Sequence, residues 1–197
     1  MLFPERFDTD RLTFERLTRE RIDLFEFYRI CSSDPRIEEV TQYMPWEPHH
    51  SVKETAKFVT DVEQQWADDK AATYVIRPQE GEADAGDIAG LTTLSCDWDR
   101  RTGSLGLWLR KRFWGRGYSG ERAAAVMEIA FERLELEIVA VTHHVDNEKS
   151  QRAIEKYVEA YGGKRDGLLR NWIPYDDEVA DEYRYTITRK EYQENRR

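Results

Sequence analysis

Cysteine is scarce in this sequence of 197 residues, which contains only Cys31 and Cys96. Two cysteines form neither a disulfide framework nor a CxxC metal knuckle. We therefore expect both to be reduced thiols in a reducing compartment. Long hydrophobic runs are also missing, since no stretch approaches the roughly 20 apolar residues of a membrane span. No apolar run follows residues 1–6, so a signal peptide is not expected. These absences predict a cytoplasmic protein that does not enter a membrane.

Lysine is also scarce, and the chain has no net positive charge. The chain has 8 Lys beside 22 Arg, and its 39 acidic residues outnumber the 30 basic ones, for a net charge of −9. Such a balance is a poor match to the phosphate backbone of a nucleic acid. It suits a cationic substrate better, because an acidic surface attracts positive charge. A Lys-poor, acidic composition is also typical of salt-adapted cytosols, which stands here as a hypothesis about the source.

Aromatic residues are plentiful, with six Trp, ten Tyr and eight Phe. Side chains of this size need a packed interior, so global disorder is excluded. A chain of this length can bury roughly 70% of its extended surface without disulfides or metals. No Pro/Ser-rich linker and no internal repeat divides it. We therefore predict a single domain, residues 1–197.

Apolar periodicity predicts alternating strands and helices. Expected strands are 12–16, 72–77, 87–96, 103–109, 138–145, 168–172 and 183–188; expected helices are 18–31, 51–67, 121–134 and 147–161. Thr18 would cap the first helix, and Ser51 with Glu54 forms a capping box for the second. Short connections between 72 and 109 indicate an antiparallel meander. The prediction is an α/β (α+β) fold with a mixed sheet of about seven strands and helices on both faces.

A glycine-rich segment lies between the fourth expected strand and the following helix. It reads Arg112-x-x-Gly115-x-Gly117-x-x-Gly120. Backbone N–H groups at such a helix start point toward one spot, and the helix dipole makes that spot positive. The segment therefore suits a phosphate or pyrophosphate, with Arg112 and Arg116 adding charge. A glycine-rich turn that binds nothing is the alternative.

The same segment also spells GxGxxG, the pattern of dinucleotide-binding sites. Such a site needs an acidic residue at the tip of the next strand, about 20 residues on. Here that strand ends in Thr142-His143-His144. A nicotinamide-dependent oxidoreductase is therefore the least favoured of the functions considered.

Further motifs run in order along nearly the whole chain. They are Thr9-Asp10-Arg11-Leu12-Thr13 with Thr18, Met44-Pro45-Trp46-Glu47-Pro48, Gly106-x-Trp108-Leu109, Trp114-Gly115-Arg116-Gly117-Tyr118-x-x-Glu121, Phe131-Glu132-x-Leu134, Asn147-x-x-Ser150 with Glu155-Lys156, and Gly167-x-x-Arg170 with Asp181 and Tyr185-x-Ile187. Together with the glycine segment, they resemble the GNAT N-acetyltransferases, and among these the RimJ/RimL-type ribosomal-protein N-terminal acetyltransferases. The resemblance implies a GNAT-like, mostly antiparallel sheet that splays between the fourth and fifth expected strands, 103–109 and 138–145. It also implies acetyl-CoA as co-substrate, no metal, and direct acetyl transfer to an amine.

The resemblance also implies roles for individual residues. Cofactor binding falls to the backbone of Trp108 and Leu109, to Asn147, and to Arg112, Trp114, Gly115, Arg116, Gly117, Tyr118, Ser119 and Gly120. Leu109 would supply the oxyanion donor, and Ser150 or Tyr157 would protonate the leaving thiolate. Trp46 and His143 would lie on the substrate side. Alternatives remain for three of these residues: Asn147 and Ser150 as helix caps, and Tyr157 as a core residue.

The general base and the acceptor stay open in the sequence. Ser104 stands where the branch often has Glu, which leaves Asp97, Asp99 or a water relay as possible bases. Without a carboxylate there, amines of low pKa are the easier acceptors, namely protein N-termini or amino sugars. Adjacent histidines on a strand point to opposite faces, so His143 and His144 are not expected to share a metal ion. A binding module without catalysis is a further alternative, and both a monomer and a homodimer are compatible with the sequence.

Overall fold

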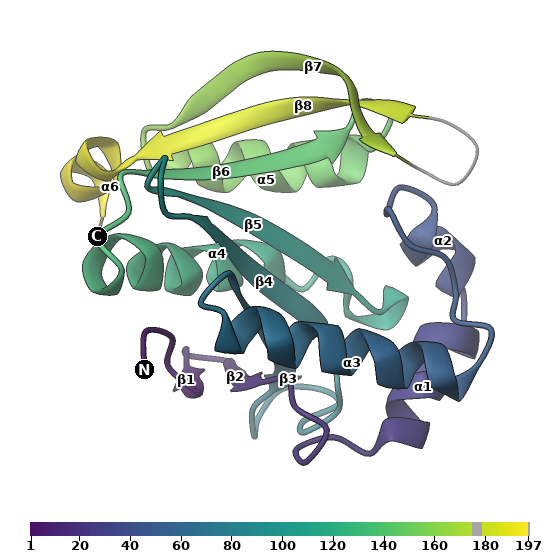
Figure 1. Ribbon diagram of the computed structural model, residues 1–197. Helices are drawn as coiled ribbons and strands as arrows, with labels where there is room; N and C mark the ends of the chain where they lie inside the picture. Colours follow the sequence, from purple (N-terminus) through teal and green to yellow (C-terminus); the bar gives the residue numbers. More distant parts are fainter. Residues whose placement is uncertain (175–178, 197) are drawn as a thin grey trace.

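The computed structural model describes residues 1–174 and 179–196. Eight strands form one sheet in the order β1-β2-β3-β4-β5-β6-β8-β7 (Figure 1). The strands are β1 (Arg6–Asp8), β2 (Leu12–Arg16), β3 (Ala71–Pro78), β4 (Gly90–Asp97), β5 (Thr102–Leu109), β6 (Ile138–His144), β7 (Lys164–Pro174) and β8 (Val179–Thr188). Among the described strands, only β5 and β6 pair in parallel. The mixed, mostly antiparallel α/β sheet predicted from sequence is confirmed, with one strand more than expected.

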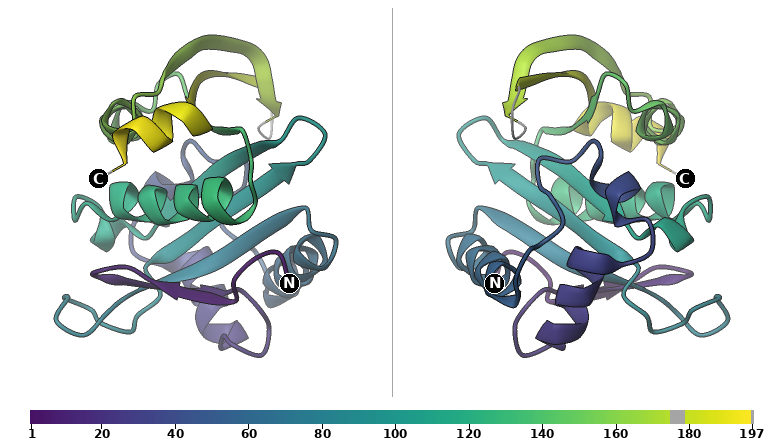
Figure 2. Two further views of the ribbon diagram at one scale, coloured as in Figure 1. Left: turned by 90° about the vertical axis from the view of Figure 1, so that its left-hand side faces the viewer. Right: turned by 90° about the vertical axis from the view of Figure 1, so that its right-hand side faces the viewer.

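Helices cover both faces of this sheet. They are α1 (Leu24–Ser33), α2 (Ile37–Thr41), α3 (Val52–Ala67), α4 (Tyr118–Glu128), α5 (Glu148–Ala160) and α6 (Arg189–Asn195), with a 3-10 turn η1 (Lys111–Phe113) and a π-helical turn η2 (Ile129–Arg133). Helices α4 and α5 lie on one face, and α1 and α3 lie on the other (Figures 1 and 2). This arrangement places both helices that follow β5 and β6 on the same side of the sheet.

Local side-chain chemistry explains where the helices begin. Ser51 accepts a hydrogen bond from the N–H of Glu54, as expected, while the Glu54 carboxylate accepts from His50 rather than from Ser51 N–H. Asp23, not Thr18, caps α1, because its carboxylate accepts from two N–H groups of the first turn at 2.8 and 2.9 Å. An acidic cap is also favoured by the helix dipole. The Thr18 prediction is therefore wrong, because the helix begins five residues later than expected.

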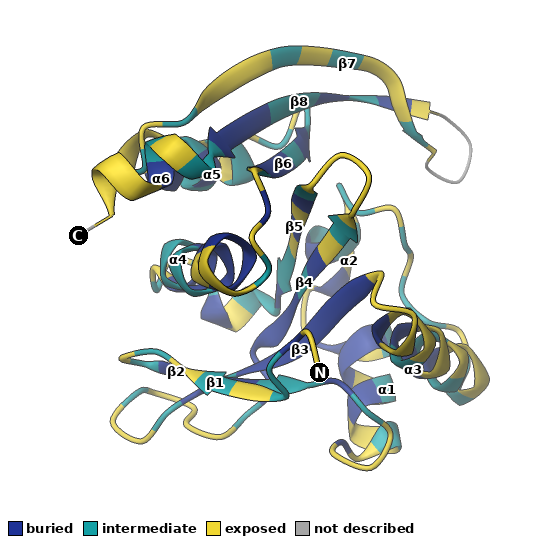
Figure 3. Cartoon of the chain, turned by 60° about the vertical axis from the view of Figure 1, so that its left-hand side comes forward, coloured by how far each residue is buried: buried dark blue, intermediate teal, exposed yellow. Residues whose placement is uncertain are grey.

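Buried residues follow the strands of the sheet and the helix faces that lie against it (Figure 3). Val126, Met127, Val139 and Tyr185 belong to the core beneath α4 and α5. A separate cluster between the sheet and α1 and α3 includes Phe27, Val59, Val75 and Cys31. Apolar packing therefore fixes helices on both faces of the sheet.

Both cysteines are free thiols, as the sequence predicts. Burial raises the pKa of Cys31 to about 12 and that of Cys96 to about 12. Thiols with pKa values this high remain protonated at neutral pH and are poor nucleophiles. Neither cysteine therefore has the properties of a reactive residue.

None of the helices in the described residues combines the length and apolar composition needed to cross a bilayer.

Candidate active site

The two parallel strands separate at one end of the sheet. Strand β5 pairs with β6 only from Thr102 to Ser104, opposite Ile138 to Ala140. Beyond Ser104 the strands diverge, which confirms the splay expected between 103–109 and 138–145. A cavity of about 1110 Å³ opens at this end, lined by residues of α2, β5, α4, α5 and the loop after β5. We call this space the cavity.

Leu109 ends β5 at the cavity with backbone groups directed into the gap. Arg110 N–H donates to Ala89 O at 2.8 Å, so Arg110 and Ala89 are a hydrogen-bonded pair of the β4–β5 ladder. Hydrogen-bonded and non-hydrogen-bonded pairs alternate along an antiparallel ladder. The backbone of Leu109 therefore faces away from β4, whereas that of Trp108 faces Leu91 in β4. The indole of Trp114 donates to Leu109 O at 2.7 Å, and the Leu109 N–H remains directed at the open edge.

The glycine loop, residues 112–120, forms the wall next to Leu109. Gly115 and Gly117 have φ angles of +79° and +81°, a left-handed backbone that glycine adopts without steric cost. Gly117 is the N-cap of α4. The loop residues that line the cavity are Phe113, Trp114, Gly115, Gly117, Tyr118, Ser119 and Gly120. The start of α4 therefore directs unpaired N–H groups and positive dipole charge at the cavity.

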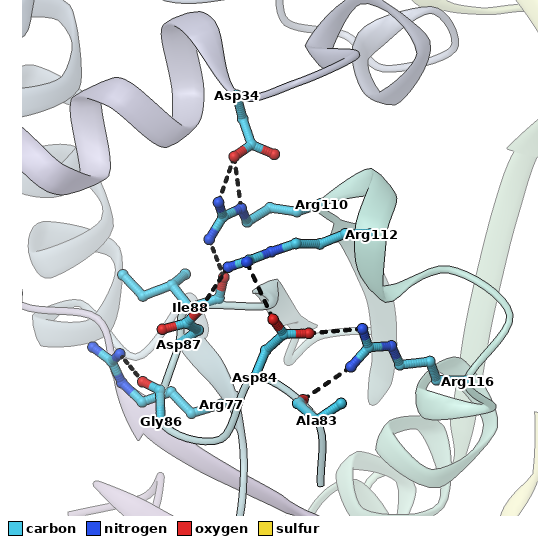
Figure 4. A network of polar contacts seen from close by, with 10 residues as sticks. All are labelled: Asp34, Arg77, Ala83, Asp84, Gly86, Asp87, Ile88, Arg110, Arg112 and Arg116. Carbon is cyan, nitrogen blue, oxygen red and sulfur yellow. Dashed lines mark hydrogen bonds and ion pairs between the residues drawn. The ribbon is translucent and has the colours of Figure 1, made fainter.

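Arg112 and Arg116 are held on the outer side of the glycine loop (Figure 4). Asp84 forms ion pairs with Arg112 at 3.3 Å and with Arg116 at 2.8 Å. Asp87 pairs with Arg112 at 2.6 Å. The Arg116 hydrogen bond is the leading cause that lowers the pKa of Asp84. Neither arginine lines the cavity. Both are held by ion pairs with the acidic loop between β3 and β4, residues 79–87, which also neutralise their charges.

Cations inside the cavity come from different elements. Lys111 of η1 and Lys149, Arg152 and Lys156 of α5 all line it. The ammonium groups of Lys111 and Lys149 lie 4.1 and 4.9 Å from the centre of the Trp114 ring, within cation–π range. The sequence motifs did not point to these residues. Their signal was present, since spacings of three and four place residues 149, 152 and 156 on one helix face.

Asn147, Ser150 and Tyr157 all line the cavity from α5 or its cap. Asn147 Oδ1 accepts from the N–H of Ser150 at 3.1 Å, so the helix-cap interpretation of Asn147 is confirmed. Ser150 is the donor in this bond and not a cap. Tyr157 belongs to the core beneath α5, which confirms its packing role without removing it from the cavity wall.

Trp46 and His143 do not line the cavity. Trp46 packs against Trp108, with ring centres 5.5 Å apart, so it touches a residue that does line it. His143 is buried, and its ring nitrogens contact His144 O at 2.8 Å and the Tyr185 hydroxyl at 3.3 Å. The structure therefore separates these two residues from the other members of the expected site.

The carboxylates considered as bases also lie elsewhere. Asp97 ends β4 and Asp99 lies in the turn between β4 and β5, at the opposite end of β5 from Leu109. At about 3.3 Å per residue, that strand spans roughly 25 Å. Glu39 of α2 is the partly buried carboxylate at the cavity, 2.8 Å from Lys111 Nζ. Hydrogen bonds from Lys111 and Arg36 lower the pKa of Glu39, so it is a permanent anion at neutral pH.

Metal-ligating side chains do not cluster within residues 1–174 and 179–196: no group of three or more His, Cys, Asp or Glu gathers there in a way that would hold an ion.

The sequence and the fold are both similar to those of known proteins. The model of the acetyltransferase (GNAT) domain family matches residues 11–157. The uncharacterized N-acetyltransferase p20 of Bacillus licheniformis is 23% identical over 185 residues, covering 93% of this chain and 98% of that protein. YdaF of Bacillus subtilis (strain 168), which carries the name of a ribosomal N-acetyltransferase, is 36% identical over 93 residues, or 46% of this chain and 51% of YdaF.

A solved structure supports the fold independently. The microcin C7 self-immunity acetyltransferase MccE, in complex with acetyl-CoA and AMP, superposes with a TM-score of 0.78 at 18% identity, covering 95% of this chain and 98% of MccE. The likeness to YdaF supports the RimJ/RimL-type branch indicated by the sequence motifs. With the family match spanning most of the chain and the splayed sheet in place, this protein belongs to the GNAT acetyltransferase family.

Proposed function

We propose that this acetyltransferase moves the acetyl group of acetyl-CoA directly to an amine, without an acyl-enzyme. One observation carries the proposal: the outward-facing N–H of Leu109 and the glycine-loop start of α4 open into the same cavity. One feature suits a carbonyl oxygen that becomes negative, and the other suits phosphate groups. The MccE complex with acetyl-CoA, which shares the fold, supports this choice of co-substrate.

Some residues of the cavity bind the co-substrate and others take part in catalysis. Acetyl-CoA supplies the activated acyl group. The amides of residues 114–120 bind its phosphates, with the lysines of η1 and α5 adding charge. The N–H of Leu109 stabilises the carbonyl oxygen as the amine attacks. The Ser150 hydroxyl, at the open start of α5, donates a proton to the departing thiolate, and Tyr157 is the alternative donor. Asn147 uses its side-chain oxygen as the cap, which leaves its amide NH₂ for the ligand.

Amines of low pKa fit this cavity best as acceptors. An α-amino group with a pKa near 8 is roughly 10% neutral at pH 7, whereas a lysine near 10.4 is about 0.04% neutral. This difference corresponds to ~3 kcal/mol in favour of the α-amine. Ser104 provides no carboxylate to remove the proton, and Glu39 is paired with Lys111. A protein N-terminal α-amine or a small amine of similar pKa is therefore the proposed acceptor.

The first experiment separates the function classes. Coenzyme A at millimolar concentration should raise the melting temperature of the protein, and NAD should not, because only a ligand of the native state stabilises it. Release of free thiol from acetyl-CoA should then be faster with basic peptides that have a free N-terminus, or with amino sugars, than with peptides blocked at the N-terminus. Absence of any shift with coenzyme A would reject the proposal. A shift without thiol release from any amine would favour the non-catalytic binding module.

The negative charge of Asp84, in the acidic loop of residues 79–87, is expected to weaken the binding of coenzyme A. Asp84→Asn removes one negative charge near the glycine loop and removes the ion-pair partner of Arg116, while Arg112 keeps its pair with Asp87. We expect the Kd for coenzyme A, measured calorimetrically at low salt, to fall about fivefold, since a single charge at this range contributes about 1 kcal/mol. The gain should shrink in high salt through screening. Asp99→Asn, on the distant β4–β5 turn, is the matched control. An unchanged Kd for Asp84→Asn would show that the two arginines do not reach the phosphates.

A further inference from the structure

A second wall of the cavity is made of apolar and aromatic side chains. They come from α2, the turn after it and β5, and are Val40, Tyr43, Met44 and Trp108. We call these four residues the apolar wall. Side chains alternate along a strand, and Leu109 packs in the cluster that includes side chains of the glycine loop. Trp108 packs instead against the cluster beneath α1 and α3, so it points to the other side of the sheet.

The apolar wall crosses the gap between the two diverging strands. Trp108 belongs to β5, while the Tyr43 ring lies 5.0 Å from the ring of His144, which ends β6. Val141 of β6 packs beneath α5, so His144, three residues further on, faces the opposite side of the sheet. The wall therefore lies on the side of the sheet away from α5. It is adjacent to the Leu109 N–H but opposite the residues proposed to hold the cofactor, which leaves it for the acceptor.

Packing holds the apolar wall in place. Val40 is only 7% exposed, and the ring of Trp46 supports Trp108 at 5.5 Å between ring centres. Helix α2 also packs against α1 and η1. A preformed apolar surface favours an apolar ligand group, because burial removes that group from water without first ordering the protein.

The carboxylates of the cavity are poorly placed to bind a second cation at this wall. Among the described residues, those that line it are Glu39, Asp146 and Glu148. Glu39 forms ion pairs with Lys111 at 2.8 Å and with Arg36, which neutralise its charge. The side chains of Asp146 and Glu148 are 75% and 79% exposed, so water screens them. The apolar wall therefore selects by burial and not by charge.

We propose that the apolar wall binds the side chain next to the reacting amine, so that the preferred acceptor is a peptide whose first residue is apolar or aromatic. The α-amine of such a residue reaches the acyl group at Leu109 while its side chain lies against Met44 and Trp108. An N-terminal Gly or Ser leaves the wall in contact with water, and a polyamine brings a second charge against an apolar surface. This inference rests on the proposed function, because acetyl transfer is what brings an amine to Leu109.

A peptide series that differs only in its first residue tests the proposal. Thiol release from saturating acetyl-CoA is measured with Leu, Phe, Met, Ser and Gly at that position, and with spermidine as the polyamine. We expect kcat/KM for Leu, Phe or Met to exceed that for Gly or Ser by about 10- to 100-fold, as for an apolar group that fills an apolar pocket. Equal values across the series, or spermidine as the best acceptor, would overturn the proposal.

Met44→Gln places a polar group in the apolar wall without a large change in side-chain shape. We expect it to lower kcat/KM for the peptide with the preferred first residue about tenfold, mainly through KM, and to leave the Gly peptide unchanged. Val40→Thr should act in the same direction. Phe25→Gln is the matched control, because Phe25 is an apolar residue of α1 that is 62% exposed and does not line the cavity. It should leave the order of the acceptors as it is in the wild type.

Two further results separate this proposal from the proposed function. If every peptide with a free N-terminus reacts alike in the wild type and in Met44→Gln, the proposed function stands and the apolar subsite is rejected. If coenzyme A binds but no amine releases thiol, the proposed transfer fails and the subsite fails with it. If Glu39→Gln weakens all acceptors while Met44→Gln changes none, the acceptor is bound through charge, which also rejects the subsite.

Discussion

Replacing Gly90 with alanine is expected to destabilise the protein strongly and to remove its activity. A Cβ atom built on Gly90 would lie 2.1 Å from Trp108 O and 2.8 Å from Leu109 Cα. Both are backbone atoms, so no side-chain rotation relieves the overlap. Strand β5 must therefore move away from β4 at the point where Leu109 faces the cavity. We expect a loss of ~3 kcal/mol or more, or about 10 °C in melting temperature for a chain of this size.

Catalysis should be lowered independently of stability. A displacement of about 1 Å at a reacting group lowers rates about 100-fold, and here the displaced group is the proposed oxyanion donor. Acetyl transfer measured at a temperature where the variant is folded separates the two effects. Gly106→Ala is the control in the same strand, because its Cβ would meet Thr93 Cβ at an ordinary 3.6 Å. Equal melting temperatures for Gly90→Ala and Gly106→Ala would contradict this account of the β4–β5 contact.

Asp34→Asn is expected to have the second large effect. Arg110, the residue after Leu109, donates through Nε and Nη2 to Asp34 Oδ1, with the Nε bond at 3.0 Å. The side chains are 13% and 7% exposed, so the pair is largely shielded from water (Figure 4). Arg110 Nη1 also donates to Ile88 O at 3.0 Å. Removing the carboxylate charge leaves a buried guanidinium without compensation, which costs about 3–5 kcal/mol.

Chemical unfolding of the variants tests this prediction. The urea midpoint of Asp34→Asn should fall clearly, and activity should fall with it because Arg110 anchors the end of β5. The double variant Asp34→Leu with Arg110→Met should recover most of the stability, since an apolar pair of similar volume avoids desolvating two charges. Asp61→Asn removes the exposed ion pair with Lys57 and should leave the midpoint unchanged. A double variant less stable than Asp34→Asn would indicate that Arg110 stabilises β5 without its partner.

Together these variants would measure how much the ion pairs between the α1–α2 region and the segment after β5 contribute to stability and activity. Asp34 follows α1, while Arg110 begins the loop that leads to α4. Lys111 extends this connection by its contact with Glu39 of α2. The end of α1 and the short helix α2 are therefore each attached by one ion pair to the segment between Leu109 and the glycine loop. Displacement of either pair should reach both halves of the cavity.

Local sequence patterns determined most of the secondary structure. Strand β2 has the bounds that alternation predicts, 12–16, and α3 starts at the Ser51 cap and ends at Ala67 as expected. Such features depend on residues only a few positions apart, so they can be recognised in the sequence. The elements that were missed include β1, which has three residues, too few for a pattern, and α6, which depends on a Thr188–Glu191 capping box at the end of a strand. The prediction of a single domain at 1–197 remains a prediction.

Motifs in the sequence determined the family, the glycine loop and the place of the splay. The residues of each motif lie within one strand–loop–helix unit, so their spacing can be recognised without knowing which distant residues contact them. Only the tertiary structure decided which charges serve the cavity. Asp84 lies 32 residues before Arg116 yet neutralises it, and Trp46 and His143 do not line the cavity. Ion pairs and burial join residues far apart in the chain, so the charge available at this site is a property of the folded protein and not of any motif.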